Sequence, residues 1–205
     1  MLDRWSLRII KKPLNVLAHF VVKQGIKADQ ITIGGFFIGL LSVPAIAMSH
    51  FELGLLFIVA NRVLDGLDGA VARLTHTSNR GAYLDIVLDF IFYAAVVFAF
   101  ALADPVNNAL PAAALLLSFM GTGSSFLAFA IMAERLALSS MTYPNKGFYY
   151  LNGITEGTET ILFFVLMCLL PTHFALIAWI FVVLCVITTI TRVISGAHTL
   201  QQKIY

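Results

Sequence analysis

Charged residues are scarce in this sequence. Only 12% of its 205 residues are Asp, Glu, Lys or Arg, whereas 60% are hydrophobic, and the mean hydropathy is +0.90. A soluble globular domain carries about a quarter charged residues. So few polar side chains cannot cover a water-soluble globule of this length, so the composition argues against soluble enzymes and binding modules and indicates a protein that lies in a lipid bilayer.

Cysteine is nearly absent as well. Cys168 and Cys185 lie in long apolar runs without disulfide or metal-ligand spacing, so we interpret them as small buried hydrophobic residues.

The first 27 residues lack the short apolar block and the small-residue cleavage site of a signal peptide, and we expect none of them to be removed. A net charge of only +2 gives no reason to expect a nucleic-acid partner.

Six apolar stretches come close to the roughly 20 residues that a helix needs to cross the hydrocarbon core. They are residues 31–48, 53–75, 81–103, 109–133, 154–170 and 174–199. Turn-forming residues separate them, as Asp104-Pro105 does after the third stretch. We therefore predict an all-α membrane protein with a single domain over 1–205, in which 31–199 form a six-helix bundle.

The basic residues lie on one side of this arrangement. Lys and Arg occur before the first stretch, around the turn between the second and third, in the loop between the fourth and fifth, and in the C-terminal tail. The other three loops contain neither. Because cytoplasmic loops carry an excess of Lys and Arg, we expect both termini to be cytoplasmic.

Residues 2–23 show a different pattern. Their apolar side chains recur at helical spacing and their basic side chains fall on the opposite side; the apolar set is Leu7, Ile10, Leu14, Leu17 and Val21. This pattern predicts a basic amphipathic helix in the cytoplasmic interface, with a kink at Pro13. A basic tail that only sets the orientation is the alternative.

Four aspartates interrupt the apolar pattern of the second and third stretches, near their cytoplasmic ends: Asp65, Asp68, Asp85 and Asp89. Each charge at the bilayer centre costs about 2.5–3.5 kcal/mol, so we expect all four to face the bundle interior. Spacings of three and four residues put each pair on one helix face. The short turn between the stretches makes the two helices antiparallel neighbours. Four facing carboxylates repel unless protons or a cation neutralise them, and oxygen ligands suit Mg²⁺ or Mn²⁺.

Small and basic residues accompany the aspartates. Gly66, Gly69 and Gly81 allow close helix packing and also leave space for a ligand, and we keep both interpretations. Arg73, one turn beyond Asp68, can bind a phosphate with two parallel hydrogen bonds. Arg62, one turn deeper than Asp65, is interpreted as a structural counter-charge.

These residues form the pattern D-x-x-D-G-x-x-A-R-x7-G-x-x-x-D-x-x-x-D, which runs from Asp65 to Asp89. The pattern resembles the signature of the CDP-alcohol phosphotransferase (CDP-alcohol phosphatidyltransferase) family. The six-helix plan and the N-terminal helix extend the resemblance over most of the chain, which is similar to bacterial inner-membrane members. The resemblance implies transfer of a substituted phosphate from a CDP-linked lipid, usually CDP-diacylglycerol, to an alcohol, with release of CMP. The mouth of the site would be cytoplasmic.

The resemblance also implies roles for individual residues. Asp65, Asp68 and Asp85 would hold two Mg²⁺ or Mn²⁺ ions, and Asp89 would complete that metal centre and act as the general base. The residues that would bind the CDP-lipid are Gly69, Ala72, Arg73, the weaker candidate Ser78, and Asp29 and Thr32 from the segment before the first helix. In that segment Ala28 replaces the proline that family members often have. The resemblance further suggests a homodimer.

The acceptor alcohol is less defined. The stretch 125–132 lacks the arginines that inositol-phosphate-type members carry. Arg135 and Lys146 can bind the phosphate of an acceptor such as glycerol 3-phosphate, or they are ordinary cytoplasmic anchors. Glu156 and Glu159 fit an amine-bearing acceptor such as serine or an amino alcohol, or they are interfacial acids. His76 has no evident partner.

Two other classes of protein fit an acidic cluster in a membrane. One is a transporter whose aspartates relay protons or cations. The other is a metal-binding structural protein that has lost catalysis. The Gly, Ala and Arg residues between the acids argue against the transporter, and the presence of all four acids argues against lost catalysis.

Overall fold

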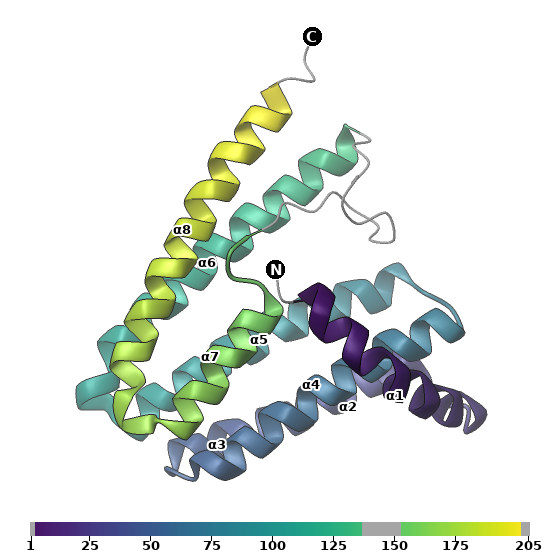
Figure 1. Cartoon of the computed structure of the whole chain (residues 1–205), viewed down its shortest axis with the longest axis horizontal. Helices are drawn as coiled ribbons and strands as arrows, with labels where there is room; N and C mark the ends of the chain where they lie inside the picture. The colour runs from purple at the N-terminus through teal and green to yellow at the C-terminus, as the bar shows by residue number, and fades with distance from the viewer. Residues whose placement is uncertain (1–2, 137–152, 202–205) are drawn as a thin grey trace.

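In the computed structural model, the described residues are 3–136 and 153–201, and every regular element within them is helical. Figure 1 shows the arrangement. The elements are α1 (Asp3–Lys23), α2 (Ala28–Leu40), α3 (Ser42–Ala47), α4 (Phe51–Leu74), α5 (Asn79–Ala103), α6 (Pro105–Arg135), α7 (Gly157–Leu169), the 3₁₀ turn η1 (Pro171–His173) and α8 (Phe174–Gln201). The predicted all-α class is confirmed for this part of the chain.

Four segments of the described chain are long and apolar enough to cross a membrane: Ala28–Ala47, Asn79–Ala103, Pro105–Arg135 and Pro171–Gln201. The second predicted stretch forms α4, which is 24 residues long but carries five charged side chains. The fifth forms α7, which has only 13 residues. Helices therefore occupy all six predicted stretches, and four of them meet the length and composition of a membrane span.

The first predicted stretch is interrupted between α2 and α3. Pro44 has no N–H and cannot donate a hydrogen bond to the carbonyl of Leu40, four residues earlier. The chain accordingly makes a turn at Leu41 before α3 begins. The predicted continuous stretch 31–48 is therefore two helices, α2 and α3, which together have the length and composition of one span.

Side-chain caps fix the boundaries of α5. The Ser78 hydroxyl accepts a hydrogen bond from the Gly81 backbone N–H at 3.0 Å and so caps the start of the helix. At the other end, the Asp104 carboxylate accepts from the Asn107 N–H at 3.2 Å and caps α6, with Pro105 in the first position of that helix. The predicted turn at Asp104-Pro105 is therefore both the end of one helix and the start of the next.

Two helix pairs pack most extensively, α6 with α8 and α2 with α4. The long helices α6 and α8 run side by side, and α1 lies across α4 (Figure 1). Helix α2 contacts both α4 and α5, whereas the backbones of α4 and α5 make few close contacts with each other. The separation of these two helices leaves room between them for the charged side chains that both carry.

Aromatic side chains fill the main core. The rings of Phe100 and Phe174 stack with centroids 4.7 Å apart, and those of Phe163 and Phe181 with centroids 4.2 Å apart. Cys168 and Cys185 are free and buried in the same region, as expected. A smaller cluster joins α1 and α2 to α4 through Ala18, Ile31, Leu67, Ala70 and Val71.

We predict that replacing Phe100 by Ala lowers the free energy of unfolding by about 3 kcal/mol, because it leaves a cavity between Phe51 and Phe174. Phe98 on the same helix is the matched control, since it is 52% exposed whereas Phe100 is fully buried. Lipid tails are as apolar as the core, so Phe98→Ala should cost much less. Unfolding in detergent by SDS titration measures both, and equal losses would contradict this description of the core.

Candidate active site

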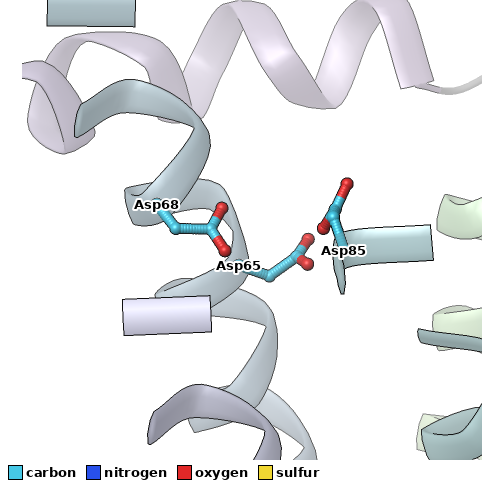
Figure 2. A group of neighbouring side chains, drawn as sticks. All are labelled: Asp65, Asp68 and Asp85. Atoms are coloured by element: carbon cyan, nitrogen blue, oxygen red, sulfur yellow. The ribbon is translucent and has the colours of Figure 1, made fainter. Parts of the chain in front are cut away.

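Three of the four aspartates lie together between α4 and α5. One carboxylate oxygen from each of Asp65, Asp68 and Asp85 can be chosen so that all three lie within 4.8 Å of one another. Figure 2 shows Asp65 and Asp68 reaching from one helix toward Asp85 on the other. The two helical pairs of the sequence do converge, although their helix backbones remain apart.

This aspartate trio (Asp65, Asp68 and Asp85) has the properties of a site for a hard divalent cation. Its donors are all oxygens, and within the described residues no other group of acidic, His or Cys side chains has this arrangement. Asp68 is only 6% exposed, and its Oδ2 accepts a hydrogen bond from the Thr32 hydroxyl at 2.5 Å. Three carboxylates at this separation repel one another unless protons or a cation neutralise them, and their oxygen donors fit Mg²⁺ or Mn²⁺.

Asp89 lies beside the trio and has a different partner. Its Oδ1 and Oδ2 accept hydrogen bonds from the Arg62 guanidinium at 2.6 and 3.2 Å, and Oδ2 also accepts from the Tyr93 hydroxyl at 3.2 Å. Arg62 is also 3.5 Å from the Asp65 carboxylate. The four aspartates line one small cavity, the aspartate cavity, together with residues of α2 and α4. Arg62 is thus the counter-charge of Asp89 and Asp65, which agrees with the interpretation from sequence.

A larger cavity of about 360 Å³ opens at the ends of α4 and α5 where the turn joins them. We call it the mouth cavity. Its lining includes the residues that sequence analysis assigned to a CDP-linked lipid, namely Asp29, Thr32, Gly69, Ala72, Arg73 and Ser78. Its volume lies within the usual range of ligand pockets. His76, for which the sequence offered no partner, also lines this cavity.

Gly81 permits a close approach in the wall of the mouth cavity. A Cβ atom at this position would lie 3.2 Å from both Asp29 Oδ1 and Ser78 Oγ. Asp29 in turn lies 3.6 Å from the exposed guanidinium of Arg80. The absence of a side chain at Gly81 therefore lets Asp29 and Ser78 pack closely against α5, and all three residues line the mouth cavity.

A third cavity of about 150 Å³, the arginine cavity, lies among α5, α6, α7 and α8. Arg192 and Glu156 line it, and each is only 7% exposed. Arg192 Nη1 donates to the Thr122 carbonyl at 3.2 Å, and its guanidinium lies over the Phe126 ring at 5.5 Å. Tyr93 also lines this cavity, so one hydroxyl connects it with Asp89.

Arg192 is not among the site residues predicted from the sequence. The available signal was a single arginine within the long apolar stretch 174–199, because an ionisable residue inside a span marks a functional site by default. The predicted acceptor residues lie elsewhere: Arg135 is exposed at the end of α6, and Lys146 lies outside the described residues. Arg135 does not line the arginine cavity.

Glu156 and Glu159 have a local structural role. They form a reciprocal capping box at the start of α7, in which the Glu156 N–H donates to Glu159 Oε2 at 3.1 Å. Glu156 Oε1 also accepts from the Gly153 N–H at 3.3 Å. Capping the helix accounts for the three-residue spacing of this pair. From the sequence, the two acids were interpreted as contacts of an amine-bearing acceptor or as interfacial acids.

Comparison with known proteins gives close and partial relatives. The chain is 51% identical over 201 residues to inner membrane protein YnjF of Escherichia coli (strain K12), covering 98% of both chains. It is 33% identical over 99 residues to the archaetidylinositol phosphate synthase of Pyrococcus horikoshii, covering 48% of this chain and 53% of that one.

The fold also matches solved structures of the phosphatidylinositol phosphate synthase PgsA1 of Mycobacterium tuberculosis. The structure with CDP-DAG bound has a TM-score of 0.66, and the complex with manganese and citrate has 0.68. Both share 20% sequence identity with this chain and cover 89% of it, and it covers 92% and 88% of theirs. At this identity the likeness concerns the fold alone.

The family model for CDP-alcohol phosphatidyltransferase matches residues 26–191, which include the aspartate trio, the mouth cavity and Asp89. The resemblance inferred from the aspartate pattern is thereby confirmed. The chain belongs to the CDP-alcohol phosphatidyltransferase family and is a membrane transferase of phospholipid synthesis.

Proposed function

We propose that this protein transfers a phosphatidyl group from a CDP-linked lipid, such as CDP-diacylglycerol, to the hydroxyl of a small polar alcohol and releases CMP. One observation carries this proposal: Asp68 and Asp85 line both the aspartate cavity and the mouth cavity. A diphosphate in the mouth cavity would therefore meet the aspartate trio directly. The residues that open that cavity include Gly69, Ala72 and Arg73, which belong to the family pattern.

The aspartate trio is the proposed holder of two divalent ions, Mg²⁺ or Mn²⁺. When bound, such ions stabilise negative charge on phosphate oxygens and on the leaving group. Thr32 supports this role because its hydroxyl donates to Asp68 and fixes one oxygen of that carboxylate. Such partners behind metal ligands orient them and tune their affinity.

Arg73 and Ser78 are the proposed contacts of the cytidine diphosphate at the mouth. Arg73 is exposed at the cytoplasmic end of α4 in the proposed orientation, where its guanidinium can pair with a phosphate. Ser78 uses its oxygen to accept from the Gly81 N–H, which leaves its own O–H to donate. Asp29 and Thr32 also line this cavity.

Asp89 is the proposed general base. It lies in the aspartate cavity, and its Oδ2 is hydrogen-bonded to Tyr93, whose side chain also lines the arginine cavity. An acceptor in the arginine cavity would bring its hydroxyl to the side of Asp89 that faces Tyr93. Asp89 would take the proton as that oxygen attacks phosphorus and the bond to CMP breaks.

We further propose that the acceptor carries an anionic group that binds Arg192, as glycerol 3-phosphate would. The cavity beside Arg192 holds several water volumes, which suits a small polar molecule. Arg135 and Lys146 are the alternative phosphate contacts. Acceptors of the inositol, serine or amino-alcohol type are the other candidates.

In the proposed membrane arrangement, residues 31–199 form six spans within a single domain, and α1 lies in the cytoplasmic interface. Helix α4 spans about 36 Å at 1.5 Å per residue, enough for a 30 Å core, and its Asp65 and Asp68 line the aspartate cavity. Both termini and the mouth cavity are on the cytoplasmic side of a bacterial inner membrane. The protein is proposed to act as a homodimer.

Replacing Asp68 by Asn should lower Mn²⁺ affinity and CMP release together, each by at least about 100-fold, because even groups behind a metal ligand account for 10–100-fold. Asp89→Asn should abolish CMP release, because it removes the proposed base, while Mn²⁺ affinity should fall by less than in Asp68→Asn, since Asp89 lies outside the trio. Purified protein with CDP-diacylglycerol, a panel of alcohols and titrated Mn²⁺ gives both readouts.

Glu134→Gln is the matched control for this pair, because Glu134 is an exposed acid at the end of α6 and should leave both quantities unchanged. CMP release by Asp89→Asn at the wild-type rate would refute the assigned base. If the wild-type protein released no CMP with any acceptor and instead moved ions into liposomes, the transporter would replace the transferase.

Replacing Arg192 by Met should raise the KM for the acceptor by roughly tenfold or more, as expected for the loss of about 1.5–3 kcal/mol in a charged hydrogen bond. The KM for CDP-diacylglycerol should not change. Arg135→Met is the matched comparison, and Arg192→Lys tests whether charge alone suffices. An acceptor KM that rises in Arg135→Met and not in Arg192→Met would move the acceptor site to the end of α6.

A further inference from the structure

Residues 153–156 form a short non-helical segment that leads into α7, the 153–156 segment. Two of its residues, Thr155 and Glu156, are each 7% exposed and line the arginine cavity. Arg192 on α8 lines the same cavity. An acceptor bound to Arg192 would therefore also meet this segment.

Two hydrogen bonds hold the 153–156 segment on α8. The backbone N–H and the hydroxyl of Thr155 both donate to Thr188 Oγ1, at 3.1 and 2.9 Å. Thr188 is fully buried, so its loss as an acceptor would leave the buried Thr155 N–H without this partner. Thr188 precedes Arg192 by four residues and lies on the same face of α8. The segment is thus attached one helical turn from the guanidinium.

Gly153 brings the backbone of the segment directly against that guanidinium. A Cβ atom at Gly153 would lie 2.5 Å from Thr188 Cγ2 and 2.9 Å from Arg192 Nη2. Any side chain at this position would therefore displace Thr188 or Arg192. The other terminal nitrogen of Arg192, Nη1, donates to the Thr122 carbonyl of α6 at 3.2 Å. The guanidinium is accordingly confined by the 153–156 segment at one nitrogen and by α6 at the other.

The segment also determines where the charge of Glu156 is directed. An acid turned into the cavity would repel an anionic acceptor. The Glu156 side chain instead accepts from the Gly153 N–H at 3.3 Å and from the Glu159 N–H in the capping box of α7. Backbone donors at the start of a helix favour negative charge. This arrangement keeps the acid on backbone groups while Arg192 supplies positive charge to the cavity.

We propose that Gly153 and Thr188 are positioning residues for the acceptor. They hold the 153–156 segment so that the Arg192 guanidinium is fixed at the wall of the arginine cavity, where it binds the anionic group of the acceptor. Neither residue lines the cavity itself. Because they act on a part of the acceptor that does not react, they determine its affinity and leave the chemical step unchanged. The inference rests on the proposed placing of the acceptor at Arg192.

The first test replaces Gly153 by Ala and measures the kinetics of CMP release with the acceptor that the panel of alcohols identifies. The KM for the acceptor should rise roughly three- to tenfold, because the new Cβ displaces the guanidinium and weakens a charged hydrogen bond. Both kcat and the KM for CDP-diacylglycerol should stay within about twofold of the wild type. Gly34→Ala is the control, since a Cβ at Gly34 meets no atom within 4 Å.

A double variant distinguishes positioning from packing. Thr188→Ser removes Cγ2, the atom nearest to the new Cβ, and keeps the oxygen to which Thr155 donates. Gly153→Ala with Thr188→Ser should therefore recover much of the unfolding free energy that Gly153→Ala loses, as measured by SDS titration. The acceptor KM should stay raised, because the Cβ still approaches Arg192 Nη2. A KM that recovers together with stability would reduce Gly153 to a packing role. If Gly153→Ala alone does not fold, the double variant gives the KM.

Thr188→Val tests the attachment of the segment, because valine keeps the shape of threonine and lacks its oxygen. The acceptor KM should rise with kcat unchanged, and it should be lower in Thr188→Ser, which retains the oxygen. Thr191→Val is the matched control, since Thr191 is exposed on the same helix.

The outcomes separate this inference from the proposed function. If Arg192→Met raised the acceptor KM and either Gly153→Ala or Thr188→Val did not, that residue would lose its positioning role while the acceptor site stands. An unchanged acceptor KM in Arg192→Met would overturn the acceptor site and this inference with it. Failure of the wild-type protein to release CMP with any acceptor would overturn the transferase as well.

Discussion

The arrangement of this protein depends on neutralising four carboxylates inside an apolar helical bundle. Each uncompensated charge in that environment costs several kcal/mol. Arg62 compensates Asp89 and, at a longer distance, Asp65. Divalent cations would neutralise the negative charge that remains on the trio.

The same constraint explains how the helices are spaced. Helices α4 and α5 do not pack closely on each other, because the charged side chains that both carry lie between them. Helix α2 contacts both and supplies Thr32 to Asp68 and the Gly35 carbonyl to Asn61. Helix α2, which the sequence predicts only as part of a membrane span, thus orients Asp68 and Asn61 through these hydrogen bonds.

Much of the fold and part of the site could be predicted from sequence. Apolar runs of membrane length, the Asp104-Pro105 turn and the amphipathic pattern of 2–23 all correspond to observed helices, because each depends on local chemistry. Helical spacing was also enough to bring Asp65, Asp68 and Asp85 together. The separation of Asp89 was not predictable, since it depends on the reach of Arg62 across to α5. The cavity beside Arg192 was also not predicted, because it depends on how the four helices α5, α6, α7 and α8 pack together.

The most direct test of this account is to locate the cation. Crystals grown with Mn²⁺ and CDP-diacylglycerol would give anomalous scattering from manganese alone. We expect the peaks inside the aspartate cavity, in contact with the carboxylates of Asp65, Asp68 and Asp85. Manganese found only outside the aspartate cavity would contradict this arrangement.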